Sequence, residues 1–269
     1  MTNMLLAVVE VSSCSAELFL NDIPIIHIGL DESRFPLEAM AIEHALVPGE
    51  NRLELWVDPT PVPRTSAITT RKLVMQPAQA EGRIIRLDVG DTPMRGHGEP
   101  IATVSFDLPE PTDLELPRRY ATAFTLERSR PRLAFQDGAM LTLDSALRDE
   151  VDTVLDDLEA CLARGDLDRL LELHSVAHAD VSKAYPAWTR EAIRADFAAR
   201  IARHQEAEEP VIRRDRENAR LRLFGDGRVV ACFDAEGRAA VKTRSARDGS
   251  GNDYPVFLSR IDGRLRIIR

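Results

Sequence analysis

The chain has 269 residues, and 44% of them are hydrophobic, which is enough for one large core or two ordinary ones. Its formal net charge is -9, and its arginines are not interleaved with aromatic residues that could stack on bases, so we expect no nucleic-acid partner. The apolar run Met4–Val9 is too short for a membrane span and lacks the basic start of a signal peptide, so we expect no membrane association.

The three cysteines, Cys14, Cys161 and Cys232, are far apart in the sequence and form no CxxC pair. Their odd number and wide spacing predict reduced, mostly buried thiols rather than a disulfide framework or a zinc site. We therefore expect a cytoplasmic protein without a metal or another cofactor.

Charge is distributed unevenly along the chain. Residues 144–209 hold 16 acidic and 8 basic side chains, whereas residues 211–269 hold 8 acidic and 14 basic ones. An acidic helical segment is thus followed by a basic segment of strands. Two interpretations stay open: the segments attract each other within the fold, or the basic strands face an anionic partner.

The first part of the chain, residues 1–143, shows the period of two that is typical of half-buried strands. Turn signals support it, because Asn21-Asp22 precedes one strand and Pro48-Gly49 favours a tight turn between two others. Strands are predicted at residues 4–9, 16–20, 23–28, 42–47, 52–57, 67–75, 83–89, 101–108, 120–127 and 132–135. Strands that recur at such short intervals predict an all-β sandwich domain over residues 1–143.

A few segments of this part do not fit the strand pattern. Residues 37–45 are the one stretch where a helix is an alternative. The Pro-rich segments 58–63 and 109–117 are expected to be exposed loops or edge crossings, since Pro cannot donate a hydrogen bond to a sheet. Residues 90–100 hold glycines without the strand-to-helix context of a phosphate-binding loop, so we predict a long loop there.

Residues 16–59 contain AELFLNDIPI and LVPGENRLELWV, in which tight turns join apolar strands. In this respect the segment resembles the β-sandwich modules of bacterial carbohydrate-binding and adhesin-type proteins. Sugar binding by such a module would need exposed aromatic side chains. Trp56 and Tyr120 are the two candidates, but a tryptophan buried in the core is the preferred interpretation of Trp56.

At Asp144 the pattern changes to a helical period, and three amphipathic helices follow. The first has one apolar stripe from Leu147 to Leu162, and the second reaches His174. Cap and breaker residues set their limits: Asp144 or Ser145 before the first helix, Gly165 after it, Asp166 before the second, Thr189 at the start of the third and Pro210 beyond its end.

After Pro210 the period becomes two again, with strands predicted near residues 220–223, 229–233, 239–244, 256–261 and 265–268. The last two form the clearest hairpin, because Asp262-Gly263 fits a type I′ turn. We expect residues 144–269 to form an α+β domain, with helices packed on a curled antiparallel sheet.

This order of elements, together with Gly165-Asp166 and the segments 255–258 and 261–268, resembles the nuclear transport factor 2-like superfamily, also called cystatin-like cones. The resemblance implies a sheet that wraps around the helices and leaves a pocket between them. It also implies a possible homodimer, since members commonly dimerise through the outer face of the sheet. In that case a second copy or an anionic partner would meet four arginines there: Arg220, Arg222, Arg264 and Arg266.

His174 and His178 are four residues apart and share one face if the second helix continues, with Asp180, Tyr185 and Trp188 just beyond. Enzymes of the resembled superfamily often place a His and an Asp in the pocket, so these five residues are the predicted ligand pocket. A metal is not expected, because the glutamate of HExxH and a third ligand are missing. Structural histidines, exposed or hydrogen-bonded, are the preferred interpretation of the pair.

The sequence contains no complete catalytic or cofactor motif. The preferred hypothesis is a non-enzymatic cytoplasmic protein of two domains that binds a protein or a small ligand, as an accessory factor. The alternative is a small-molecule hydrolase or isomerase in which His174 or His178 acts as a base. A purely structural role through dimerisation is a third hypothesis. A histidine hydrogen-bonded to a carboxylate in a deep pocket would favour the enzyme.

Overall fold

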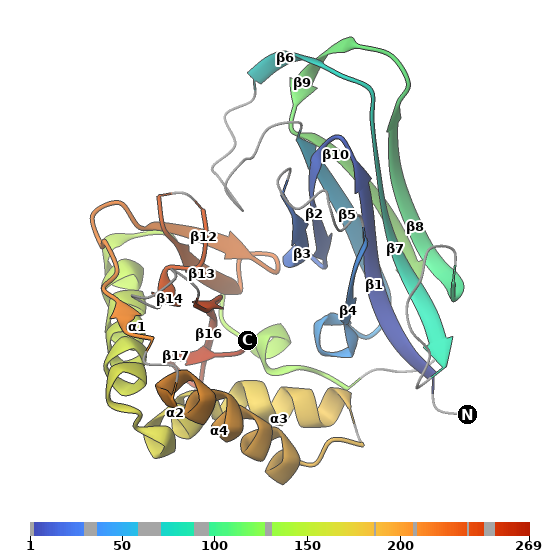
Figure 1. The fold of residues 1–269 in the computed structure, drawn as a ribbon. Helices are drawn as coiled ribbons and strands as arrows, with labels where there is room; N and C mark the ends of the chain where they lie inside the picture. The colour runs from blue at the N-terminus through green and yellow to red at the C-terminus, as the bar shows by residue number, and fades with distance from the viewer. Residues whose placement is uncertain are drawn as a thin grey trace. The chain divides into compact units, whose positions relative to one another are not determined.

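A computed structural model describes residues 3–29, 37–58, 71–88, 97–126, 131–185, 187–206, 209–235, 237–244 and 251–269. Contacts divide the chain into two compact units, Met1–Pro131 and Arg132–Arg269 (Figure 1). The protein is mostly β, with five antiparallel sheets and four α-helices in the part that the structure describes. None of the helices in those ranges has both the length and the apolar composition that a membrane span needs.

The first unit contains two four-stranded sheets and a smaller one. The large sheets have the strand orders β4-β1-β7-β8 and β10-β5-β2-β3, and β6 pairs with β9. The strands are β1 (Asn3–Ser12), β2 (Ser15–Leu20), β3 (Ile23–Ile28), β4 (Leu37–Ala41), β5 (Glu50–Asp58), β6 (Arg71–Met75), β7 (Ala78–Asp88), β8 (Glu99–Leu108), β9 (Thr112–Leu116) and β10 (Arg118–Thr125).

Both large sheets of the first unit contribute to one hydrophobic core. Val9 and Ile84 come from one sheet, Leu18 and Leu55 from the other, and all four are fully buried. A Cβ atom at Gly82 of β7 would lie 2.3 Å from Leu18 Cδ1. The glycine therefore allows the close packing of this strand against the opposite sheet.

Residues 37–47 differ from the sequence prediction. Residues 37–41 form β4 instead of a helix, and the short 3-10 helix η2 (Glu43–Ala45) replaces the strand expected at residues 42–47. The buried carboxylate of Glu43 accepts a hydrogen bond from the Leu5 N–H at 2.8 Å. This side chain takes the place of a backbone partner for β1, so the strand pairing ends there.

One other prediction for this unit is wrong. Residues 112–116, expected in a loop, form β9, because the prolines at 111 and 117 lie outside the paired stretch. Trp56 is buried, with its ring centroid 4.5 Å from that of Phe19, and Tyr120 packs on Phe106 at 5.6 Å. The interpretation of Trp56 as a core tryptophan is therefore confirmed, and neither residue is the exposed platform that sugar binding would need. Parts of the predicted strands 67–75 and 83–89 and of the loop 90–100 lie outside the described residues.

The second unit combines four helices with a four-stranded and a three-stranded sheet, whose strand orders are β12-β13-β16-β17 and β11-β14-β15. The helices are α1 (Ser145–Arg164), α2 (Leu167–Leu173), α3 (Ser175–Ala184) and α4 (Arg190–Glu206). The strands are β11 (Val211–Ile212), β12 (Arg220–Phe224), β13 (Val229–Phe233), β14 (Val241–Thr243), β15 (Asp253–Tyr254), β16 (Phe257–Ile261) and β17 (Arg264–Ile267).

The predicted cap residues do set the helix limits. Asp144 and Asp166 accept hydrogen bonds from backbone N–H groups in the first turns of α1 and α2, and Thr189 does the same for α4. Gly165 ends α1 in the left-handed conformation, with φ 65°. The sequence prediction missed only α3, which begins directly after a break at His174.

Helices and the four-stranded sheet share one core in the second unit. Val151 and Leu158 of α1, Leu170 of α2, and Val230 and Leu258 of the sheet are all buried in it. The strands turn alternate residues to this core, as the predicted period of two requires. The hairpin turn before β17 has positive φ at both central residues, as expected for a type I′ turn.

Residues 132–143 belong to the second unit, although the sequence pattern grouped them with the first. Leu141 is buried in the core of the second unit, and its N–H donates to the Gly227 carbonyl oxygen at 2.9 Å. The strand expected at residues 132–135 is instead the 3-10 helix η3 (Ala134–Asp137). Its first N–H, that of Ala134, donates to Asp180 Oδ2 at 2.7 Å, a bond that favours a helical turn over strand pairing.

Candidate functional site

His174 and His178 lie against Phe197 of α4. The ring centroids of the two histidines are 6.0 Å apart, and the Phe197 centroid lies 4.7 Å from His174 and 5.1 Å from His178. His174 Nδ1 donates to the Leu170 carbonyl oxygen at a distance of 2.9 Å. The same carbonyl oxygen accepts the His174 backbone N–H at 3.1 Å, so the ring of His174 adds a second hydrogen bond at the break between α2 and α3.

Burial lowers the pKa of both histidines. Burial and, after it, the positive charges of His174, Arg194 and Arg200 lower the pKa of His178, which is 7% exposed, to about 4. Burial is also the main cause of the lowered pKa of His174. Both rings are therefore neutral at pH 7. No hydrogen bond links either ring to a carboxylate within the described part of the chain.

Asp180, the predicted carboxylate partner of the histidines, is engaged elsewhere. It is buried, its Oδ2 accepts the Ala134 N–H at 2.7 Å, and its Oδ1 accepts a hydrogen bond from Lys183 Nζ at 2.9 Å. Both carboxylate oxygens thus hold η3 and the end of α3 in place. The expected pairing of a histidine with Asp180 is not formed.

Tyr185 and Trp188 lie in the connection between α3 and α4. Their rings are stacked, with centroids 4.8 Å apart and an interplanar angle of 22°. The Trp188 side chain remains 51% exposed, and the backbone N–H of Trp188 donates to the Tyr185 carbonyl oxygen at 2.8 Å. We call Tyr185, Trp188 and the first turns of α4 the aromatic corner. Here a large aromatic side chain stacks on a second ring and remains half exposed to solvent.

The four sheet arginines form two separate pairs. Arg220 and Arg222 are on β12, and Arg264 and Arg266 are on β17, at opposite edges of the sheet. The register places all four on the face opposite the helical core. Three strand spacings separate the pairs by about 14 Å, and buried residues of β13 and β16 lie between them. All four therefore lie on the face opposite the helices, but they do not form one continuous patch.

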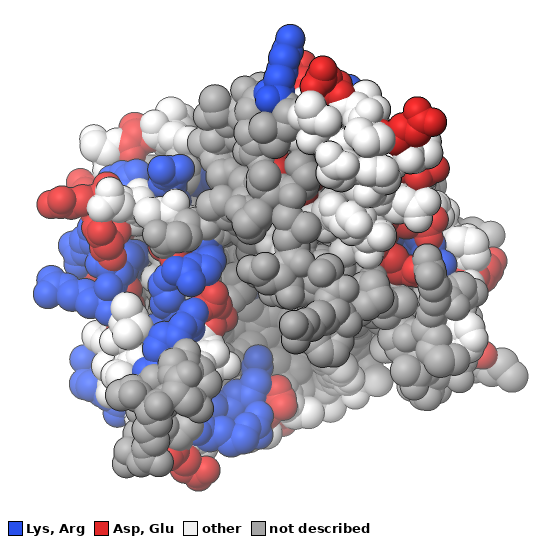
Figure 2. All heavy atoms as spheres, turned by 45° about the horizontal axis from the view of Figure 1, so that its top comes forward, with Lys and Arg blue, Asp and Glu red and all other residues white. Residues whose placement is uncertain are grey.

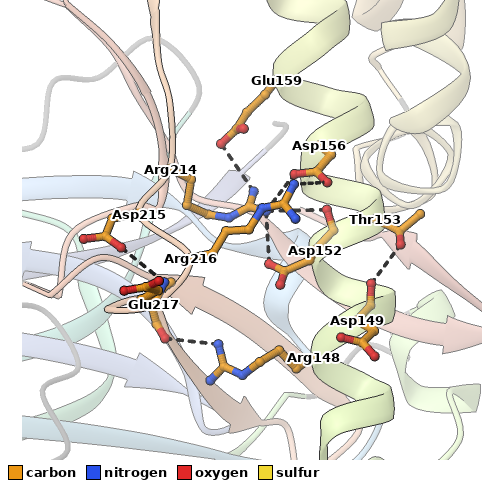
Figure 3. Close-up of polar contacts among 11 residues, drawn as sticks. Arg148, Asp149, Asp152, Thr153, Asp156, Glu159, Arg214, Asp215, Arg216 and Glu217 are labelled. Atoms are coloured by element: carbon orange, nitrogen blue, oxygen red, sulfur yellow. Dashed lines mark hydrogen bonds and ion pairs between the residues drawn. The ribbon is translucent and has the colours of Figure 1, made fainter.

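Figure 2 shows Lys and Arg side chains gathered over the second unit, with Asp and Glu among them. Two arginines of the second unit, Arg214 and Arg216, form ion pairs with acidic residues of α1 (Figure 3). Arg214, whose side chain is 2% exposed, lies 3.0 Å from Asp152, 3.0 Å from Asp156 and 3.3 Å from Glu159. Arg216 pairs with Asp156 as well.

The acidic residues of this cluster lie at spacings of four and three on α1, so they share one face of the helix. Burial raises the pKa of Glu159, and the charge of Arg214 opposes that rise. For these residues the first interpretation of the charge pattern holds, since the acidic helix attracts the basic segment after Pro210. The spacing of the acidic residues in α1 predicts that they share one face, but nothing in the sequence identified Arg214 as the residue that pairs with them.

A second polar cluster that the sequence did not predict links α4 to the small sheet. His204 Nδ1 lies 3.0 Å from Glu209 Oε2, and the same oxygen accepts hydrogen bonds from Thr243 Oγ1 at 3.1 Å and Asn252 Nδ2 at 3.0 Å. The His204 side chain is only 3% exposed. This is a histidine paired with a carboxylate, but it is enclosed by the fold, and its partners tie α4 to β14 and β15.

No group of three or more metal-binding side chains occurs within the described ranges. No family model matches the chain, and the comparisons with curated proteins and with solved structures give no match either. We therefore infer function from the geometry of the described residues.

Proposed function

We propose that this chain is a non-enzymatic two-domain binding or accessory protein. In this proposal the first unit is a β-sandwich and the second an α+β domain of the nuclear transport factor 2-like type. Two large sheets around one core support the former, and helices packed on one face of an antiparallel sheet support the latter. The free, buried cysteines support a cytoplasmic location, and burial raises the pKa of each to about 11, which makes them unreactive.

The different uses of the five candidate residues carry the proposal. His174, His178 and Asp180 are engaged in packing and hydrogen bonds, whereas Trp188 is exposed although it is the kind of residue that folding tends to bury. Tryptophan and tyrosine are the residues most often found at the energetic centres of protein interfaces. The aromatic corner is therefore the binding site of the proposal.

The alternative, a hydrolase or isomerase with His174 or His178 as base, has less support. A general base is most effective when its pKa lies near the working pH, and the pKa of His178 is about 4. The histidine–carboxylate pair described above, His204 with Glu209, is closed to solvent.

A homodimer through the outer face of the sheet also has less support than a different partner. A two-fold interface brings the same surface of both copies together. Here Arg220, Arg264 and Arg266 are exposed on that surface, so like charges would meet. We therefore propose a partner that is a protein of another kind.

The test is affinity capture from a lysate of the cells that express the protein. Three baits are compared: the unchanged chain, Trp188→Ala, and Val74→Ala, which removes an apolar side chain that is 60% exposed on the first unit. We expect at least one protein to be enriched by the unchanged chain and by Val74→Ala, and to be reduced about tenfold with Trp188→Ala. The same set of proteins at equal levels on all three baits would contradict the proposed site.

A further inference from the structure

We infer that the aromatic corner binds an acidic protein segment, which places an apolar side chain against Trp188 and carboxylates against the first turns of α4. This inference rests on the proposed function and specifies the chemistry of its partner. The observations that carry it are the exposed ring stack, the charges beside it and the contacts that restrain the corner.

The first turns of α4 carry two arginines, Arg190 and Arg194, and two acids, Glu191 and Asp196. Arg190 and Arg194 are exposed, and neither forms an ion pair with a described residue. Asp196, the nearest acid along α4 after Glu191, is 3.3 Å from Arg200 and thus has a cation of its own. Two arginine side chains are therefore available to carboxylates of a partner, and arginine binds carboxylates in a planar, two-pronged geometry.

Arg194 lies on the side of α4 that faces α3. It precedes Phe197 by three residues, so the two side chains share one face of the helix, and its charge contributes to the lowered pKa of His178. α3 and α4 pack directly against each other, and His178 contacts Phe197 across that contact. A cation at this position is not neutralised by Asp180, whose oxygens are engaged with Ala134 and Lys183.

Hydrogen bonds and the ring stack restrain the described residues of the corner. The Tyr185 N–H donates to the Val181 carbonyl oxygen at 2.9 Å, and the Thr189 hydroxyl accepts the Ala192 N–H at 3.1 Å. Between these two caps, the ring stack restricts the Trp188 side chain. Binding therefore costs little conformational entropy, which favours a specific contact over a loose one.

The sequence has two tryptophans, and the test uses the Trp56→Phe chain, in which Trp188 alone remains. Its fluorescence then reports on the corner. The probes are two pooled libraries of fluorescein-labelled 12-residue peptides with Leu or Phe at alternate positions. One library has Glu and Asp at the other positions, and the matched library has Gln and Asn. Anisotropy measures binding, and quenching of Trp188 places the peptide at the corner.

We expect the acidic library to bind at least about tenfold more tightly than the neutral one, with the difference shrinking as salt is added. Trp188→Ala should weaken binding about tenfold, measured by anisotropy, and Arg190→Gln with Arg194→Gln about three- to tenfold. The matched control is Arg264→Gln with Arg266→Gln, which removes two exposed arginines from β17 and should leave affinity unchanged.

Several results would overturn the inference. These are equal binding of the neutral library, no binding of the acidic library, loss of binding in the control pair rather than in Arg190 and Arg194, and binding of phosphatidylserine vesicles in place of peptides. The proposed function would survive all of these results, because it depends on capture of a partner that is reduced by Trp188→Ala. If capture were equal with and without Trp188, the proposed site itself would be wrong.

Discussion

At the scale of single residues, His178 links the packing of α3 and α4 to pH. Its pKa is about 4 in the folded chain, and the ordinary value of 6.5 applies when the chain unfolds. Between these values the unfolded state binds more protons, so stability is full above pH 6.5 and falls as the pH is lowered towards 4. Burial of His174 acts in the same direction.

We expect the free energy of unfolding to fall by about 1 to 3 kcal/mol over this pH range, measured by urea unfolding. His178→Phe should flatten the dependence, because the uncharged ring takes no proton in either state. His97→Gln, at an exposed position, is the control and should keep the slope. An unchanged slope in His178→Phe would show that another group is responsible.

Arg214 is the second residue whose burial has a measurable consequence. Arg214→Met leaves Asp152, Asp156 and Glu159 facing one another without their shared buried cation. We expect a loss of about 3 kcal/mol in the free energy of unfolding, since breaking a buried ion pair leaves uncompensated charge. The neighbouring Arg213 is exposed, and Arg213→Met should change stability by less than about 0.5 kcal/mol. Equal effects of the two changes would contradict this account of the cluster.

At the scale of elements, the helix limits of the second unit could be predicted because they depend on local chemistry. A cap residue and its backbone partner are at most a few positions apart, as for Asp144 and Gly165. The misassigned segments depend on distant partners. Glu43 ends the pairing of β4 through a hydrogen bond to Leu5, and Asp180 holds η3 across 46 positions of the sequence. No local pattern encodes such a bond.

Asp180 gives a prediction for η3 as an element. Asp180→Ala leaves the Ala134 N–H without its carboxylate, and we expect a loss of about 1 to 2 kcal/mol together with faster hydrogen exchange in residues 132–143. Lys183→Ala removes only the exposed partner of the same carboxylate and should cost less than about 1 kcal/mol. Unchanged exchange in Asp180→Ala would mean that η3 is held by its apolar contacts alone.

The candidate site could be predicted only in part, for a related reason. The helical spacing correctly placed His174 and His178 near each other. Whether a side chain is buried depends on what packs over it, and Phe197 covers both rings from a different helix. Trp188 was identified as a pocket residue, but its exposure on the corner follows from the tight connection between α3 and α4, which the sequence did not specify.

At the scale of the whole molecule, the two units have separate cores, and the boundary between them can be tested with fragments. We expect residues 132–269 to fold and unfold cooperatively alone. Residues 144–269 should be less stable by several kcal/mol, because that fragment lacks the buried Leu133, Phe135 and Leu141, each worth about 1.5 to 3 kcal/mol. Circular dichroism during urea unfolding measures both, and equal stability would place the boundary at Asp144.

The claim that matters most is that the aromatic corner binds a partner while the neighbouring histidines and Asp180 maintain the fold. The most direct measurement is the affinity of the captured partner, by isothermal titration calorimetry, for the unchanged chain and for Trp188→Ala, with the free energy of unfolding measured for both. We predict a loss of affinity of about tenfold or more and a stability change below about 0.5 kcal/mol, since Trp188 is half exposed. Unchanged affinity, or a loss of binding that is matched by unfolding, would contradict the account.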